Sequence, residues 1–158
     1  MSQDFELRDI NTQLQLLKDE LIKVLDSPFL SFVELMKINE IGLYVIISDD
    51  DILYVGKTTR AGKKRIRELT TDFRSHTFNK KMLVKHLDSL GYTVNKSNIK
   101  STTESKGDVI LDVKFKEAQQ FVNTEIKKLK FKFYTTEKIQ LTNFEHFAIG
   151  VLQPLFND

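Results

Sequence analysis

Two short runs of strand-forming residues, Leu43–Ile47 and Ile52–Val55, limit the possible folds of this chain more than any other feature. Both runs are rich in the β-branched and aromatic residues that are typical of strands. The four residues between them, Ser48–Asp51, are of the kind that favours a tight turn. The pattern therefore predicts an antiparallel β-hairpin.

The simplest register of this hairpin brings two phenols together. Side chains alternate between the faces of a strand, so Tyr44 and Ile46 share one face. Ile52 and Tyr54 share the same face in the second strand, whereas Leu53 points to the opposite one. If Ile46 pairs with Ile52, then Tyr44 lies directly opposite Tyr54, about 5 Å away at Cβ. We therefore expect a pair of adjacent phenols on one face of the sheet.

The composition is that of a soluble globular protein. The chain has 158 residues, of which 41% are hydrophobic and 29% charged, and it has no cysteine. This length suits one domain with its own core, and the lack of cysteine excludes disulfides and thiolate metal sites. No apolar run approaches the roughly 18 residues of a membrane helix, and no signal-peptide pattern is present. We expect a soluble, cytoplasmic protein with no membrane partner.

The net charge of +2 conceals an uneven distribution. Residues 1–56 carry 4 basic and 11 acidic residues, whereas residues 57–85 carry 10 basic and 2 acidic ones. A strongly basic block in a nearly neutral chain indicates a surface that faces a polyanion.

Four elements of the sequence resemble the GIY-YIG endonuclease family. Gly42-Leu43-Tyr44 and Tyr54-Val55-Gly56 resemble the two halves of the family signature, with Leu and Val each replacing an Ile. The two tyrosines are ten residues apart, as in the family. The run Lys63-Lys64-Arg65-Ile66 fits the segment with the family arginine. Glu145 and Asn157, twelve residues apart, fit the family glutamate and asparagine. The resemblance covers roughly residues 40–158.

This resemblance implies a catalytic site for phosphodiester hydrolysis. Its candidate catalytic residues are Tyr44, Tyr54, Lys57, Arg65, Glu145 and Asn157. Glu145 would be the ligand of one Mg²⁺ (or Mn²⁺), whose other ligands are water and phosphate oxygens. Arg65 would stabilise the charge on the phosphate. We assign Tyr44 as the base and Tyr54 to orienting water or phosphate, with Lys57 favouring the phenolate form. Asn157 would fix the site through its amide.

Two of these residues also have ordinary structural explanations. Thr142 and Glu145 have the spacing of a capping box, in which the glutamate only bonds back to the start of its helix. Asn157 could be an unremarkable residue of the C-terminal tail.

The basic block supplies the candidates for DNA binding. They are Arg60, Lys63, Lys64, Arg67, Arg74, His76, Lys80 and Lys81. For several of them a solvated helix face is the alternative explanation. His76 is a candidate for a phosphate contact, whereas His86 lies on a predicted apolar stripe and is more typical of a core.

Residues 1–39 are predicted to be a helical extension. Apolar residues from Leu7 to Val24 recur at alternating spacings of three and four, as on one face of a helix. Such a helix can pack on the domain, or it can form the seam of a homodimer.

The second half of the chain is expected to finish the sheet. The segment 92–116 is predicted to be an insertion, with a surface loop at Asn95–Gly107 and an additional strand at Val109–Phe115. A helix over 118–129 and a strand at Phe131–Tyr134 follow, and the last helix runs from about Thr142 to before Pro154.

The sequence thus predicts an α/β domain at 40–158, with a small, mainly antiparallel sheet flanked by helices, after a helical extension at 1–39. The resemblance implies a Mg²⁺-dependent endonuclease of restriction-like or phage and mobile-element type that acts on double-stranded DNA. A non-catalytic nucleic-acid-binding module on the same fold, and a protein-interaction domain, are the alternatives.

Overall fold

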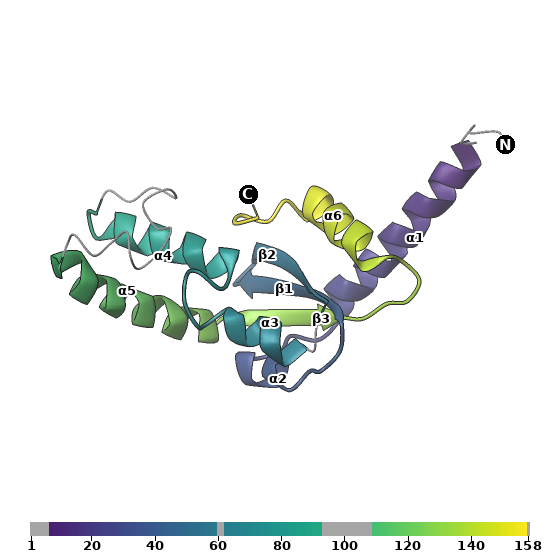
Figure 1. Ribbon diagram of the computed structural model, residues 1–158. Helices are drawn as coiled ribbons and strands as arrows, with labels where there is room; N and C mark the ends of the chain where they lie inside the picture. Colours follow the sequence, from purple (N-terminus) through teal and green to yellow (C-terminus); the bar gives the residue numbers. More distant parts are fainter. Residues whose placement is uncertain (1–6, 60–61, 93–108, 158) are drawn as a thin grey trace.

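The protein is a mixed α/β domain built on one small antiparallel sheet (Figure 1). The computed structural model describes residues 7–59, 62–92 and 109–157, and the side chains of 9–59, 64–92 and 115–157. Within these ranges the sheet has three strands in the order β2-β1-β3, and there are six helices. The predicted fold class is confirmed at this level: an α/β chain with a small antiparallel sheet.

The hairpin forms as expected and provides two of the three strands. Strand β1 spans Gly42–Ser48, β2 spans Asp51–Thr58, and β3 spans Lys130–Tyr134. Asp49 takes a positive φ of 52° in the turn between β1 and β2, a conformation that Asp tolerates better than most residues. Strand β3 pairs with β1, which places β1 at the centre of the sheet.

The register of the hairpin differs from the predicted one. Ile46 pairs with Tyr54 and Ile47 with Ile52, so that Leu53 is an extra residue in β2. At the turn Ile52 already pairs one residue further along β1 than predicted, and the β-bulge shifts the pairs beyond it by one more residue. Tyr44 therefore lies opposite Gly56 rather than opposite Tyr54. The bulge also turns Leu53 to the face of Tyr54, contrary to the alternation that we expected.

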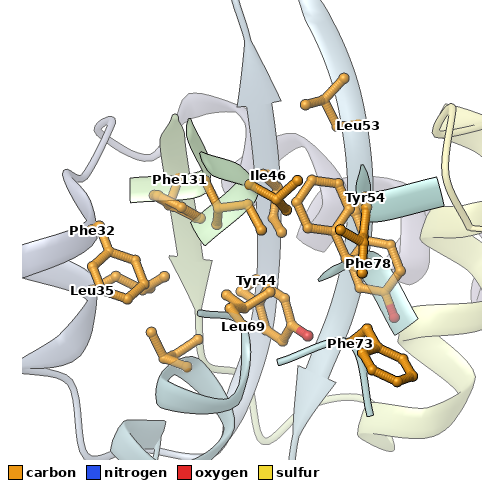
Figure 2. Close-up of a cluster of buried hydrophobic side chains, with 14 of the residues drawn as sticks. Phe32, Leu35, Tyr44, Ile46, Leu53, Tyr54, Leu69, Phe73, Phe78 and Phe131 are labelled. Carbon is orange, nitrogen blue, oxygen red and sulfur yellow. The ribbon is translucent and has the colours of Figure 1, made fainter. Parts of the chain in front are cut away.

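The helices cover both faces of the sheet (Figure 1). Their bounds are Leu7–Asp26 (α1), Phe32–Met36 (α2), Gly62–Glu68 (α3), Thr77–Ser89 (α4), Val109–Lys127 (α5) and Leu141–Leu152 (α6). Side chains from α2, α3, α4 and α5 form one hydrophobic core with Tyr44, Ile46 and Tyr54 (Figure 2). A second core on the opposite face joins α1 and α6 to Leu43, Val45 and Val55.

The predicted strand at Val109–Phe115 is wrong, because these residues form the first turns of α5. Both edges of the sheet are already occupied. Leu30 pairs with Phe131 beside β3, and the amides of Leu155 and Phe156 bond to carbonyls of β2. The helix that follows extends back through the segment instead. The predicted loop at Asn95–Gly107 lies outside the described residues.

Helix α1 packs on the domain through its C-terminal part and projects from it at its N-terminal end (Figure 1). Leu21 and Val24 are buried in the second core, whereas Ile10 and Leu14 are 43% and 50% exposed. The predicted apolar stripe is therefore only partly covered. None of the described helices is long and apolar enough to span a membrane.

Candidate functional site

A polar pocket of about 230 Å³ opens beside β2 and brings four of the predicted catalytic residues together. Tyr54, Lys57, Arg65 and Glu145 line it, together with Thr58 and Thr59. These residues come from β2, α3 and α6, which are distant in the sequence. The pocket thus combines a phenol, two cationic side chains and one carboxylate.

Tyr44 lies behind this pocket and is completely buried. Its ring packs over Gly56, where an added Cβ would lie only 2.4 Å from the Cζ and Oη atoms of Tyr44. The glycine of Tyr54-Val55-Gly56 is therefore required to make room for the tyrosine of the paired strand. The rings of Tyr44 and Tyr54 remain neighbours, with centroids 6.2 Å apart, although the two residues are not directly opposed (Figure 2).

The hydroxyl of Tyr44 is held by His76. The Tyr44 Oη and His76 Nε2 atoms are 2.6 Å apart, and the Phe78 amide donates to His76 Nδ1 at 3.0 Å. His76 is 2% exposed and is the N-cap of α4. Burial, followed by the charge of Arg65, lowers the pKa of His76 to about 3. The sequence made His76 a candidate for a phosphate contact; in the structure it is a buried, neutral ring that lines a second pocket.

The two phenols differ in their access to the pocket. Tyr44 has no exposed surface, whereas Tyr54 is 9% exposed and lines the pocket. Burial raises the pKa of Tyr44, and the neighbouring Tyr54 adds to this effect, while Arg65 opposes it. Burial also raises the pKa of Tyr54, against the opposing charge of Arg65. Of the two phenols, the geometry therefore places Tyr54 rather than Tyr44 at the pocket.

Arg65 lies at the junction of two pockets. Its Nη1 donates to Glu68 Oε2 at 3.0 Å and to the Ser75 carbonyl at 3.4 Å, which holds the guanidinium in place. Besides the pocket at Tyr54, Arg65 lines a neighbouring one of about 320 Å³. That pocket is also lined by Phe73, Arg74, Ser75, His76, Thr77 and Lys80. The cation thus reaches from the hairpin to the start of α4.

Glu145 is half-buried on the first part of α6 and faces the pocket. Burial raises the pKa of its carboxyl group, and the charge of Lys57 opposes this shift. The capping box that we considered does not form. The N-cap of α6 is Gln140, and Thr142 Oγ1 accepts a bond of 2.7 Å from Lys57 Nζ. Glu145 therefore does not cap its helix.

Asn157 bonds to the backbone of β2 next to Tyr54. Its Oδ1 accepts from the Val55 amide, and its Nδ2 donates to the Val55 carbonyl, both at 2.8 Å. The side chain thus fixes the outer edge of the strand that carries Tyr54. Asn157 does not line the pocket at Tyr54, so it supports the strand and does not take part in the pocket itself.

The predicted DNA-binding residues lie on α3, on α4 and between them. Arg60 and the side chain of Lys63 fall outside what the structure describes. Lys64 and Arg67 are exposed on α3. Arg74 is exposed and forms an ion pair of 2.8 Å with Asp72. Lys80 lines the second pocket, and Lys81 is half-buried on α4.

Sequence patterns alone did not reveal two of the contacts at this site. The bond from Lys57 to Thr142 joins residues 85 positions apart, and that from Tyr44 to His76 joins residues 32 apart. Histidine is not among the preferred N-cap residues, so nothing in the sequence marked His76 as the start of α4.

Among the described residues that line the pocket at Tyr54, Glu145 carries the carboxylate that could hold a metal ion. The described residues contain no group of three or more His, Cys, Asp and Glu side chains placed to bind one. Glu145 in an open pocket fits an ion such as Mg²⁺ that keeps most of its ligands as water and substrate oxygens. Comparison of the chain with protein-family models, curated proteins and solved structures found no match.

Proposed function

We propose that this protein is a Mg²⁺- or Mn²⁺-dependent endonuclease of GIY-YIG type that hydrolyses phosphodiester bonds in double-stranded DNA. The observation that carries this proposal is the pocket itself, because Tyr54, Lys57, Arg65 and Glu145 line one cavity. These four residues come from the signature, from the residue that follows it, and from the two more distant elements of the resemblance. A chance match of short motifs would not be expected to converge in this way.

The side chains of the pocket suit the needs of phosphodiester hydrolysis. The guanidinium of Arg65 can bind phosphate oxygens with a planar pair of donors and stabilise their charge. Lys57 adds a second positive charge and is positioned by Thr142. Glu145 would hold the metal ion, which supplies polarisation of the phosphate and stabilisation of the leaving oxygen.

The roles of the two phenols are reversed relative to our expectation from the sequence. Tyr54 lines the pocket, so we propose that it meets the attacking water and accepts its proton. The pKa of Tyr54 is raised by burial, and cations in the loaded site would lower it towards the operating pH. Tyr44, which is fully buried, would support Tyr54 and Arg65 from behind.

We also propose that DNA lies across α3 and the start of α4. Lys64 and Arg67 are exposed on α3, and the second pocket presents Arg74 and Lys80. Arg65 lines both pockets, so one strand could place neighbouring phosphates in the two cavities. The exposed Ile10 and Leu14 on α1 support a homodimer through the N-terminal helix, and sedimentation of the wild type against Leu14→Glu would test it.

Incubation of the purified protein with supercoiled plasmid and Mg²⁺ tests the proposal. We expect nicked or linear product with Mg²⁺ and no product when EDTA is present from the start of the incubation. Intact plasmid combined with salt-dependent DNA binding would instead support a non-catalytic nucleic-acid-binding module. If the protein neither cleaves nor binds DNA, a protein-interaction domain is favoured.

A further inference from the structure

His76 is a buried polar residue that the proposed chemistry does not use. It is 2% exposed, and each of its ring nitrogens has a partner. Tyr44 from β1 and the Phe78 amide from α4 bond to the two nitrogens. The ring also packs against Tyr54 from β2, with centroids 5.4 Å apart, and Arg65 from α3 is the charged group that acts on it.

These contacts determine which nitrogen carries the proton. A backbone amide can only donate, so the bond of 3.0 Å from Phe78 requires an unprotonated Nδ1. A neutral imidazole has one N–H, which must then be on Nε2. The bond of 2.6 Å to Tyr44 is therefore donated by His76 Nε2–H and accepted by the phenol oxygen.

We propose that His76 is a positioning residue, fixed as the Nε2–H tautomer, which donates a permanent hydrogen bond to the Tyr44 oxygen. The statement that this bond serves catalysis rests on the proposed nuclease function. The statement about the tautomer does not.

This arrangement prevents His76 from acting as a base for Tyr44. If the ring took the phenol proton and kept its own, it would become an imidazolium with an N–H at both nitrogens, and it would no longer accept the bond from the Phe78 amide. Burial and the charge of Arg65 oppose the imidazolium, since they hold the pKa of His76 well below its usual value. The Tyr44 proton is consequently donated away from His76. The ring keeps Tyr44 in one orientation behind Tyr54 and Arg65.

Nuclear magnetic resonance of the folded protein tests the tautomer without any reference to activity. Long-range ¹H–¹⁵N spectra distinguish protonated from unprotonated ring nitrogens, and His76→Asn identifies the signals of His76 among the three histidines of the chain. We expect a protonated Nε2 and an unprotonated Nδ1 from pH 8 to pH 5. In Tyr44→Phe the Nε2 proton should shift and exchange faster with water. A protonated Nδ1, or a signal that Tyr44→Phe leaves unchanged, would overturn the proposal.

Two substitutions test the positioning role. Asn at position 76 can still cap α4, but it is too short to reach Tyr44. His76→Asn should therefore melt close to the wild type, and it should lower the cleavage rate at saturating DNA about 10-fold with KM unchanged. Gln reaches further with an amide donor, so His76→Gln should recover part of the rate. A wild-type rate in His76→Asn, or equal losses in both variants with lowered melting temperatures, would overturn the positioning role. If the wild type does not cleave DNA, the nuclease proposal fails, and the spectra still decide the tautomer.

Discussion

The side chain of Asn157 replaces a neighbouring strand at the edge of β2, because it bonds in both directions to Val55. Its oxygen accepts from the Val55 amide and its nitrogen donates to the Val55 carbonyl, both at 2.8 Å. The amides of Leu155 and Phe156 bond to the carbonyls of Ile52 and Leu53 just before it. The C-terminal tail thus holds the strand that presents Tyr54.

Replacing Asn157 should therefore disturb the edge of β2. In Asn157→Asp the carboxylate can still accept from the Val55 amide, but it would repel the Val55 carbonyl. In Asn157→Ala both bonds are lost. Each change should lower the free energy of unfolding by about 1–3 kcal/mol, and cleavage should fall more than stability explains. Asn143→Ala, at an exposed site on α6, is the matched control. Denaturant unfolding at neutral pH measures the difference, and wild-type stability in both Asn157 variants would contradict this account.

Much of the scaffold was predictable from local patterns. The hairpin, the strand at β3, the helices α1 and α6 and the C-terminal part of α5 follow from runs of strand-forming residues or from helical spacing. The bulge at Leu53 was not predictable, because no local pattern distinguishes it from regular pairing. Val109–Phe115 alternates like a strand, but it is continuous with the helical residues that follow it and forms the start of α5. The sheet edges instead carry contacts from Leu30 and from the C-terminal tail.

The site was predictable in its members more than in its geometry. The signature tyrosines, Arg65 and Glu145 do come together, although only Tyr54 of the two phenols lines the pocket. Which phenol is buried depends on the shifted register and on the space above Gly56. These are tertiary properties that no spacing in the sequence reports.

The exposed cations on α3 should bind DNA through its phosphates. Lys64→Glu and Arg67→Glu should weaken binding to all sequences alike and should reduce the dependence of affinity on salt concentration. Lys18→Glu, an equally exposed change on α1, provides the control for net charge. Fluorescence anisotropy with labelled duplexes at several salt concentrations measures both quantities. Equal effects of all three substitutions would show that α3 is an ordinary solvated face.

His76 should make the fold sensitive to acid. Its pKa in the folded protein is about 3, below the usual value, so the unfolded state binds more protons between pH 6.5 and pH 3. The free energy of unfolding should therefore fall as the pH is lowered through this range, by up to about 1.4 kcal/mol per pH unit from this group. His76→Asn lacks the titrating ring and should show a flatter profile. Parallel profiles for the two proteins, from denaturant unfolding at each pH, would refute this assignment.

The two phenols should differ in their consequences for the rate. Tyr54→Phe removes the hydroxyl that lines the pocket and should slow cleavage by roughly 10²–10⁴-fold, as expected for a lost general base. Tyr44→Phe removes an interior hydroxyl and should cost less, since its effect is indirect. Single-turnover cleavage with Mg²⁺ separates these rates from DNA binding. A larger loss in Tyr44→Phe would restore Tyr44 as the base, and normal rates in both variants would exclude proton chemistry by either phenol.

The cleavage rate of Glu145→Gln with Mg²⁺ tests the central claim most directly. The substitution keeps the size of the side chain and removes the carboxylate that would hold the metal ion, and no capping role complicates the result. Glu137→Gln, an exposed change with the same loss of charge, is the control. We predict that Glu145→Gln abolishes cleavage while DNA affinity stays near that of the wild type or increases, because a negative charge facing the phosphates is gone. A Glu145→Gln protein that cleaves DNA at the wild-type rate would contradict the assignment of this pocket as a nuclease site.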